Sequence, residues 1–210
     1  MTMRTVALTK ESTKDILENL LKRSPNNYGK FESAVDEILK NVKEKGDEAL
    51  FAYTKEFDKT EVTKETIRVT EEEIKEAYEA VDPALIEVIR KALVNIRSYH
   101  EKQRQNSWFT TEAKGTMLGQ KVTALASVAV YPSSVLMNIV PAKVAGVDQI
   151  VMTTPPGKDG KVNPSTLVAA KEAGADEIYK VGGAQAIGAL AYGTESIPKV
   201  DKIVDLETFS

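Results

Sequence analysis

The chain has 210 residues, of which 42% are hydrophobic and 28% are charged, and its 28 basic and 31 acidic side chains give a formal net charge of −3. This composition is typical of a globular protein with one or two domains, and it does not indicate a nucleic-acid or anionic-membrane partner, because those need a clustered basic surface. Cysteine is absent, which excludes disulfides, thiolate zinc sites and thiol catalysis.

The N-terminus carries only a short apolar run, Val6-Ala7-Leu8, before the charges at Lys10 and Glu11. This run is too short for a signal peptide. No apolar stretch of the sequence approaches the roughly 20 residues that a membrane-spanning helix needs. We therefore expect a cytoplasmic protein with no membrane partner.

The first half of the chain has the apolar spacing of helices. Residues such as Ile16, Leu17 and Leu20 recur at intervals of three and four, which places them on one helical face. Gly46 ends one of these patterns, and Asp47 is the expected N-cap of the next. The predicted helices run from Thr9 to Lys22, from Phe31 to Gly46 and from Asp47 to Phe57.

A strand and two more helices are predicted up to residue 105. Ile67-Arg68-Val69 is a short apolar run typical of a strand. Thr70 is followed three residues later by Glu73, which is the pattern of a capping box at the start of a helix. Asp82-Pro83 begins the longest predicted helix, which extends to about Gln105, because proline is tolerated in the first turn.

The second half alternates strands with helices. Residues 116–125 and 128–131 are predicted to be extended, and residues 133–145 form a helix that Pro141 kinks or ends. Such alternation, with helical connections, is typical of a parallel sheet built from crossover units. The further strands are predicted at 149–153, 177–181 and 200–204, and the further helices at 164–173 and 184–192.

These patterns predict the α/β class, with a helical N-terminal part and a small parallel sheet flanked by helices. The helical part is expected to cover residues 1–125, and a Rossmann-like βαβ domain is expected to cover residues 126–204. Residues 205–210 would form a tail.

The sequence Gly182-Gly183-Ala184-Gln185 follows a predicted strand and opens a helix. Glycines there let backbone N–H groups approach a ligand, and a helix N-terminus favours an anion. The spacing is not that of the dinucleotide fingerprint. The alternative is a tight turn whose small residues serve packing, with Gln185 either bonding a ligand or satisfying nearby backbone groups.

Two other positions carry side chains that could do chemistry. Ser133 and Ser134 precede a predicted helix, and either could be its N-cap; a nucleophilic serine would need a nearby base. His100 is the only histidine in the sequence, and it lies near the end of the longest helix. A surface or packing role, or a cation at the helix C-terminus, competes there with a catalytic role.

Taken together, the motifs resemble those of histidinol dehydrogenases, from near the start of the chain to about Val204. The resemblance is specific, because separated motifs occur in the right order. The matching segments are Ile96–Gln103, Pro132–Asn138, Pro141–Gly146, Val181–Ile187 and Ala191–Ile203.

The resemblance implies an enzyme that oxidises a small-molecule substrate, L-histidinol, to L-histidine with NAD and a bound zinc. Members of that family are homodimers of chains about twice as long, built from two incomplete Rossmann-like domains and small helical pieces. NAD and zinc are therefore the cofactors that the resemblance implies, and a second copy of the chain, as in a dimer, is the implied partner.

Three departures from the family pattern limit this expectation. A glycine-rich loop is missing before Tyr131-Pro132, so that Tyr131 matches either the family's nucleotide-contacting tyrosine or, the match we favour, the tyrosine that follows the loop. The family's next nucleotide-contacting segment is replaced by Asp205–Ser210. Its zinc ligands and its acid–base pair belong to later sequence. Gln185 matches a nucleotide contact clearly.

From these departures we expect no catalytic residue and no zinc ligand in this chain, and weak or absent NAD binding through Gln185 and Tyr131. The chain alone is then expected to be inactive. The alternatives are a non-catalytic module that binds a nucleotide or pairs with another subunit, and a truncated product without a function of its own. Helical faces that the later family sequence would cover are expected to favour self-association.

Overall fold

A computed structural model of the chain describes residues 9, 12–13, 29–112 and 114–205. The chain divides into two compact units, Met1–Glu37 and Ile38–Ser210. The helix predicted from Thr9 to Lys22 lies outside the described residues, except for Thr9, Ser12 and Thr13.

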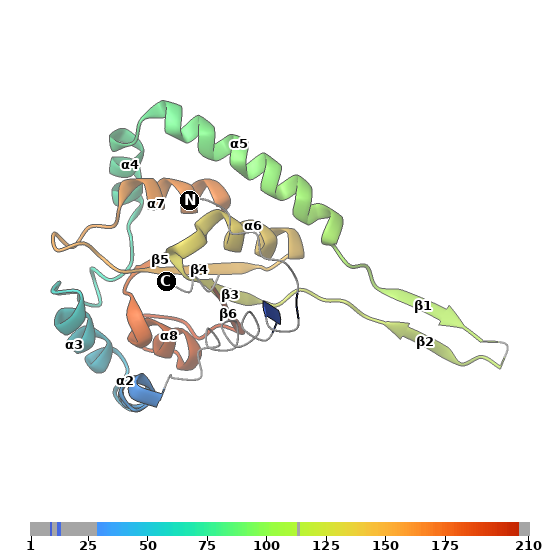
Figure 1. Ribbon diagram of the computed structural model, residues 1–210, viewed down its shortest axis with the longest axis horizontal. Coiled ribbons are helices and arrows are strands. Elements are labelled where there is room, and N and C mark those ends of the chain that lie inside the picture. The colour runs from blue at the N-terminus through green and yellow to red at the C-terminus, as the bar shows by residue number, and fades with distance from the viewer. Residues whose placement is uncertain (1–8, 10–11, 14–28, 113, 206–210) are drawn as a thin grey trace. The chain divides into compact units, whose positions relative to one another are not determined.

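The centre of the second unit is a parallel sheet of four strands in the order β5-β4-β3-β6 (Figure 1). Val128 is paired with Ile150 on one side and with Lys202 on the other. This arrangement confirms the predicted α/β class with a parallel sheet. Its strands are β3 (Ser127–Val130), β4 (Gln149–Thr154), β5 (Glu177–Lys180) and β6 (Lys202–Val204).

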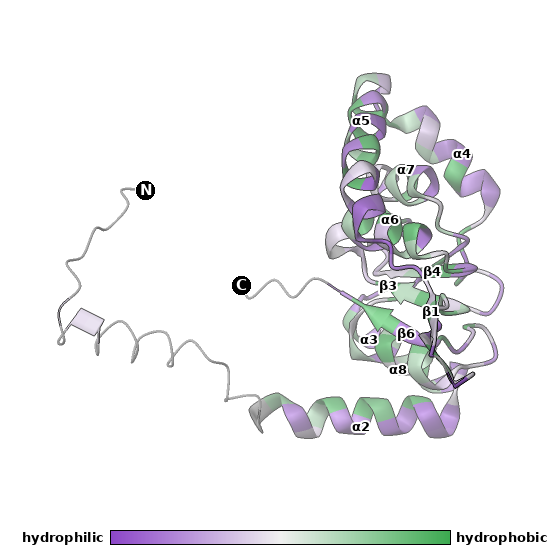
Figure 2. Cartoon of the chain, turned by 90° about the vertical axis from the view of Figure 1, so that its right-hand side faces the viewer, coloured by the Kyte–Doolittle hydropathy of each residue, from purple (hydrophilic) through white to green (hydrophobic). Residues whose placement is uncertain are grey.

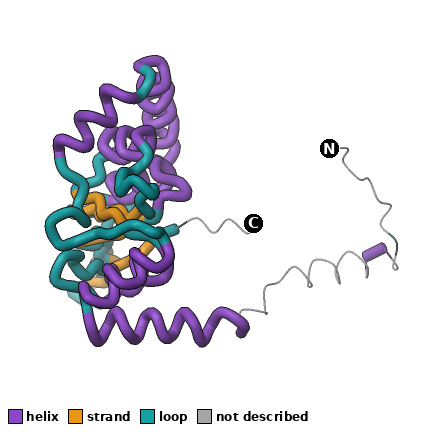
Figure 3. The backbone as a smooth tube through the Cα atoms, turned by 90° about the vertical axis from the view of Figure 1, so that its left-hand side faces the viewer, coloured by secondary structure: helices purple, strands orange, loops and turns teal. Residues whose placement is uncertain are grey.

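Helices cover both faces of this sheet, and Figure 3 shows the strands between them. Helices α4, α5, α6 and α7 pack against one another on one face, whereas α3 and α8 pack together on the other (Figure 1). The helices are α2 (Gly29–Lys45), α3 (Asp47–Phe57), α4 (Glu71–Ala80), α5 (Pro83–His100), α6 (Val135–Ala145), α7 (Pro164–Ala173) and α8 (Gly183–Tyr192), with 3-10 turns η1 (Glu101–Gln103) and η2 (Pro132–Ser134).

Successive residues of the strands contribute to two different cores. Val128 and Val130 belong to the core beneath α4 to α7. Ala129, between them, belongs to the core that also contains Leu50 of α3 and Leu190 of α8. Both faces of β3 are therefore apolar, as expected for a parallel sheet covered on both sides. In Figure 2, β3 and β4 are coloured toward the hydrophobic end of the scale. Side chains from both sides of the predicted boundary at residue 126 share these cores, and that boundary stays a prediction.

Local signals located several elements well. Helix α7 has the predicted bounds, and Asn163 caps it by accepting hydrogen bonds from Ser165 and Thr166. The capping box at Thr70 and Glu73 is present. Asp82 accepts a hydrogen bond from the backbone of Ala84, which begins α5 as predicted.

Other local predictions were wrong. Ile67-Arg68-Val69 is not a strand but a single antiparallel bridge between Arg68 and Tyr179, because the capping box begins α4 immediately afterwards. Asp47 does not cap α3: Gly46 occupies that position, and the Asp47 carboxylate accepts hydrogen bonds from Ser196. Pro141 does not end α6, which continues through it, and the alternative that Pro141 kinks the helix stays a prediction.

Between α5 and the sheet, the chain forms a two-stranded antiparallel arm, β1 (Trp108–Thr111) and β2 (Met117–Gln120). All eight strand residues are exposed. The arm extends away from the sheet (Figure 1). None of the helices in the described ranges is long and apolar enough to cross a bilayer.

An ion pair fixes the start of α4 to the end of the sheet strand β5. The Nζ atom of Lys180, which is 7% exposed, lies 2.7 Å from Oε1 of Glu73. The other oxygen of Glu73 accepts a hydrogen bond from the backbone N–H of Thr70, as the capping box requires. One carboxylate therefore neutralises a buried cation and caps a helix.

We predict that Glu73→Gln lowers the free energy of unfolding by about 3 kcal/mol, because it leaves the Lys180 ammonium buried without a counter-charge. Urea unfolding followed by circular dichroism measures the change. The matched control is Glu72→Gln on the same helix turn, whose ion pair with Lys75 is exposed, and it is expected to change stability by no more than about 0.5 kcal/mol. Equal effects of the two variants would contradict the assignment.

The same carboxylate makes stability depend on pH. Burial raises the pKa of Glu73, but the hydrogen bonds from Lys180 and Thr70 together lower it by more than burial raises it. The pKa of Glu73 in the folded protein therefore lies below its ordinary value. A depressed pKa contributes stability above the unfolded value of about 4.3, and this stability is lost as the pH falls through the folded pKa. The stability difference between the wild type and Glu73→Gln should shrink as the pH falls from about 5 to about 3. A constant difference over that range would show that the carboxylate is not the cause.

Candidate functional site

The carboxyl ends of the four parallel strands meet at one edge of the sheet, where ligands bind in open α/β folds. Tyr131 follows β3, Gly182 follows β5 and Asp205 follows β6. The chain leaves β3 toward β4 and β5 on one side and returns to β6 on the other. The crevice at this reversal of strand order, between β3 and β6, is the position that the topology favours for a ligand.

The turn between β5 and α8 consists of two glycines in different conformations. Gly182 is extended, and a Cβ atom there would lie 2.8 Å from Cβ of Pro155. Gly183 has a φ of 66°, which residues with a side chain rarely adopt. The chain can turn at this point because only glycine allows both the close contact of residue 182 with Pro155 and the left-handed backbone of residue 183. The result brings the N-terminus of α8 to the carboxyl edge of the sheet.

Tyr131 crosses the edge and reaches this turn. Its hydroxyl accepts a hydrogen bond from the N–H of Gly183 at 3.2 Å. Its own backbone N–H donates to the carbonyl of Val204 at the end of β6, at 3.3 Å. One residue thus connects the ends of β3 and β6 to the first turn of α8, and its hydroxyl takes a helix N–H that could otherwise bind an anion.

Gln185 lies in the first turn of α8 and is 1% exposed. Neither its Oε1 nor its Nε2 atom has a hydrogen-bond partner among the described residues. The side chain folds back toward the glycine turn, since its Oε1 is 2.6 Å from the position that a Cβ of Gly183 would occupy. Burying an amide without hydrogen-bond partners costs free energy of folding. It therefore indicates that the amide bonds either a ligand or an ordered water molecule.

The structure therefore brings both predicted binding residues, Gln185 and Tyr131, to the same glycine. It adds two polar residues that the sequence did not indicate. The hydroxyl of Thr153, on β4, is buried without a partner, and the Asn138 amide donates to the carbonyl of Tyr131 at 3.5 Å. The only sequence signal for Thr153 was its position inside an apolar strand. No sequence signal indicated Asn138.

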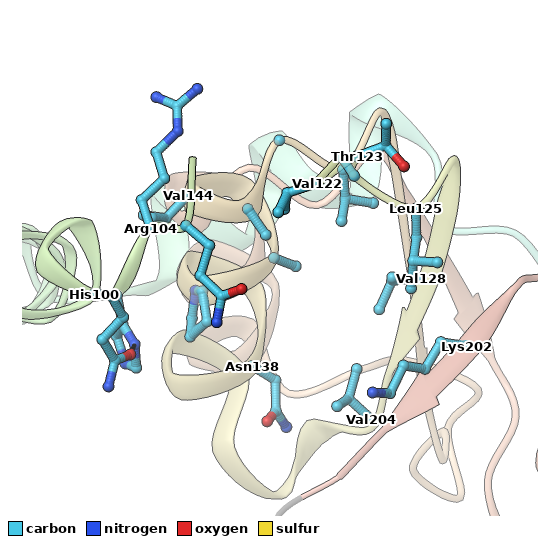
Figure 4. Close-up of a pocket in the computed structure, with 18 of the residues that line it drawn as sticks. His100, Arg104, Val122, Thr123, Leu125, Val128, Asn138, Val144, Lys202 and Val204 are labelled. Atoms are coloured by element: carbon cyan, nitrogen blue, oxygen red, sulfur yellow. Dashed lines mark hydrogen bonds between the residues drawn. The ribbon is translucent and has the colours of Figure 1, made fainter. Parts of the chain in front are cut away.

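A hollow beside this edge is separate from the two predicted residues. It has a volume of about 750 Å³ and lies between α6, the segment 122–125 and strands β3 and β6 (Figure 4). Asn138 lies at one end of it and Lys202 points into it, whereas Arg104 points away (Figure 4). Neither Tyr131 nor Gln185 lines it.

His100 borders the same hollow, at the end of α5. Its Nδ1 atom is 2.7 Å from Oε1 of Gln103, and its ring packs edge-on against Tyr99. The structure thus gives His100 a packing contact and a local hydrogen bond, and does not bring it to the glycine turn. Ser134 occupies the N-cap position of α6 but makes no capping hydrogen bond with its side chain.

No group of three His, Cys, Asp or Glu side chains that could hold a metal occurs in the part of the chain that the structure describes. The polar groups that meet at the carboxyl edge are instead an amide, a phenol, a hydroxyl and backbone N–H groups. These groups can bind and orient a polar or anionic ligand. Apart from Asp205, which follows β6 at the same edge, these groups include no carboxylate, imidazole or thiol that could act as a general base near neutral pH.

Comparison with known proteins matches this chain to histidinol dehydrogenases by family model, by sequence and by structure. A family model described as "Histidinol dehydrogenase" matches residues 21–205. The histidinol dehydrogenase of Bacillus subtilis is 56% identical over 177 residues, which are 80% of this chain and 41% of that protein. That of Methanocaldococcus jannaschii is 52% identical over 204 residues, 93% of this chain and 47% of that protein.

A crystal structure of histidinol dehydrogenase from Elizabethkingia anophelis superposes with a TM-score of 0.79 at 35% identity. The superposition covers 85% of this chain and 43% of that one. The chain therefore spans less than half the length of the relatives that it matches.

The buried amide of Gln185 leads to a prediction about stability. Gln185→Leu keeps the approximate volume but removes both unpartnered polar atoms, and should leave the free energy of unfolding unchanged or raise it by about 1–2 kcal/mol. Gln185→Glu places a carboxylate in the same position and should lower it by several kcal/mol. Urea unfolding of both variants measures this. A loss of stability in Gln185→Leu would mean that the amide has partners in solution.

Proposed function

Because the chain belongs to the histidinol dehydrogenase family, we propose that its 210 residues form the nucleotide-binding part of a site for the NAD-dependent oxidation of L-histidinol, and do not perform that oxidation by themselves. The observation that supports this proposal is the buried, unpartnered amide of Gln185 at the N-terminus of α8. It supplies a contact for a ligand but no group that moves a proton.

The residues present fit part of a nucleotide. When bound, NAD would accept a hydride from the carbon that bears the substrate hydroxyl. The residues of this chain that could hold its polar groups lie at the carboxyl edge of the sheet. The amide of Gln185 can donate and accept hydrogen bonds, and the glycine turn allows a close approach. The N–H of Gly183 is already bonded to the Tyr131 hydroxyl. Binding must compete with that bond, and we propose that it is weak.

The residues present do not fit zinc. A zinc site needs three or four nitrogen, sulfur or oxygen ligands in fixed geometry. The sequence has one histidine and no cysteine. No set of three acidic or histidine side chains converges within the ranges that the structure describes. We propose that zinc binding in this family relies on residues that these 210 do not contain.

A general base is the second missing contribution. The hydroxyl proton of an alcohol substrate needs a titratable group within hydrogen-bond distance. His100 is bonded to Gln103 at the end of α5 and does not line the glycine turn.

We further propose a cytoplasmic location and a second copy of the chain as partner.

We predict no NADH formation when the purified chain is incubated with L-histidinol, NAD and zinc. Absorbance at the NADH maximum over a wide range of protein concentrations is the measurement. A full-length relative, such as the Bacillus subtilis enzyme, is the positive control. Zinc-dependent NADH formation that increases in proportion to the concentration of this chain would overturn the proposal.

A second candidate function is a non-catalytic nucleotide-binding module, which the convergence of Gln185 and Tyr131 at Gly183 favours. Removal of the Tyr131 hydroxyl frees the Gly183 N–H for a ligand phosphate. We predict that Tyr131→Phe binds AMP or NAD about tenfold more tightly than the wild type does, a gain of about 1.4 kcal/mol.

Isothermal titration calorimetry measures this affinity, and Tyr99→Phe, a change at an exposed tyrosine of α5, is the matched control. Weaker binding by Tyr131→Phe would show that the phenol contacts the ligand directly. Absence of heat for the wild type and for both variants would remove the nucleotide-binding function.

A further inference from the structure

Three residues lie in a row across the sheet, on the face that α8 covers. The register pairs Thr153 of β4 with Tyr179 of β5. On its other side β4 pairs with β3, and continuing that register by one residue makes Tyr131 the neighbour of Thr153. Side chains alternate between the faces of a strand, and Val151, two residues before Thr153, belongs to the core beneath α3 and α8. Thr153 therefore faces α8, between the two tyrosines.

Two unpartnered polar side chains lie on this face of the sheet. Thr153 is 0% exposed, and its hydroxyl has no hydrogen-bond partner among the described residues. The amide of Gln185, in the first turn of α8, is also buried without a partner. Each such group lowers the stability of the fold. Two of them beneath the N-terminus of one helix indicate a site whose hydrogen bonds are made to a ligand.

The side chain of Tyr131 covers these two groups. Strand β4 lies between β3, which Tyr131 follows, and β5, which leads into the glycine turn. That turn packs against Pro155, immediately beyond the end of β4. To bond the N–H of Gly183, the Tyr131 side chain must therefore cross the end of β4 above Thr153. Its ring separates the Thr153 hydroxyl from solvent at the carboxyl edge.

The cover formed by Tyr131 can open without unfolding of the sheet. Its hydroxyl accepts one hydrogen bond, from Gly183 at 3.2 Å. Its backbone is held separately, by the bond from its N–H to the carbonyl of Val204. A single bond between neutral groups changes an equilibrium by about tenfold. A rotation of the side chain therefore exposes the site at a cost that a ligand can offset.

We propose that the hydroxyl of Thr153, the amide of Gln185 and the N–H of Gly183 form one site for a neutral planar group that carries an N–H donor beside an acceptor, and that this group displaces the Tyr131 side chain. The hydroxyl and the amide can both donate and accept, which matches such an edge. All three groups are uncharged, so burying an anion against them costs more than burying a neutral group. A primary carboxamide and an adenine ring both present this edge. The inference rests on the proposed function, because NAD carries both.

The first experiment opens the site and follows Gln185 directly. Tyr131→Ala removes the covering ring from the full chain, and NMR records the side-chain amide signals of Gln185, which Gln185→Leu identifies. At least one of nicotinamide and adenine is expected to shift these signals, and which one does so identifies the end of NAD that the site holds. Nicotinate, which replaces the carboxamide by a carboxylate, is expected to bind at least about tenfold more weakly than nicotinamide.

The proposal is overturned if neither neutral ring shifts the Gln185 signals, or if nicotinate binds as tightly as nicotinamide. Circular dichroism shows whether Tyr131→Ala folds. Should it unfold, Tyr131→Phe takes its place, because that variant keeps the ring and loses only its bond to Gly183.

A pair of threonine variants tests the part of the site that lies on β4. Thr153→Val, added to the opened chain, removes the hydroxyl and should weaken binding of the neutral ring about tenfold. Thr154→Val makes the same change at the next residue, which faces the opposite side of the sheet, and should leave the affinity unchanged. Equal effects of the two variants, or no effect of Thr153→Val, contradict the assignment of Thr153 to the site.

The same measurements with NAD separate this inference from the proposed function. A chain that binds nicotinamide or adenine but not NAD contradicts the proposed function and supports the site. A chain that binds NAD equally well with and without the Thr153 hydroxyl contradicts the site and leaves the proposed function in place.

Discussion

The need to exclude water from both faces of a short parallel sheet determines the arrangement of most other elements. Alternate residues of β3 face opposite ways, with Val130 in one core and Ala129 in the other. Neither core can be completed by the crossover helices alone, because α6 and α7 lie on one face and α8 on the other. Helices α3, α4 and α5, from the first half of the chain, supply the remaining cover.

The contacts that attach these helices also order the carboxyl edge of the sheet. The Lys180–Glu73 pair ties α4 to β5 immediately before the glycine turn, and Asp47 holds Ser196 beyond the end of α8. The Lys180–Glu73 pair thus holds the end of β5 that leads into the turn, beside which the amide of Gln185 is buried without a partner.

The features that concern binding lie where the ordinary rules of folding are broken. Gln185 has buried polar atoms without partners, and the arm has exposed apolar side chains. The carboxylate of Glu172, by contrast, accepts hydrogen bonds from Arg90 and Tyr78. One buried oxygen of Asp58 and Nε2 of His100 also have no hydrogen-bond partner among the described residues. Departures of this kind are expected at positions that serve a ligand or a partner.

The sequence by itself determined the elements whose signals are local, because a helix cap or a glycine turn needs only a few neighbouring residues. Helix α7, the capping box at Thr70 and the turn at Gly183 are of this kind. The motifs also predicted Gln185 as a binding residue, and that role stays a prediction. Only the tertiary structure decided that Ile67-Arg68-Val69 forms a single bridge and that the Tyr131 hydroxyl reaches a glycine 52 residues away. Those contacts follow from the strand order, which places distant segments side by side and which no local pattern encodes.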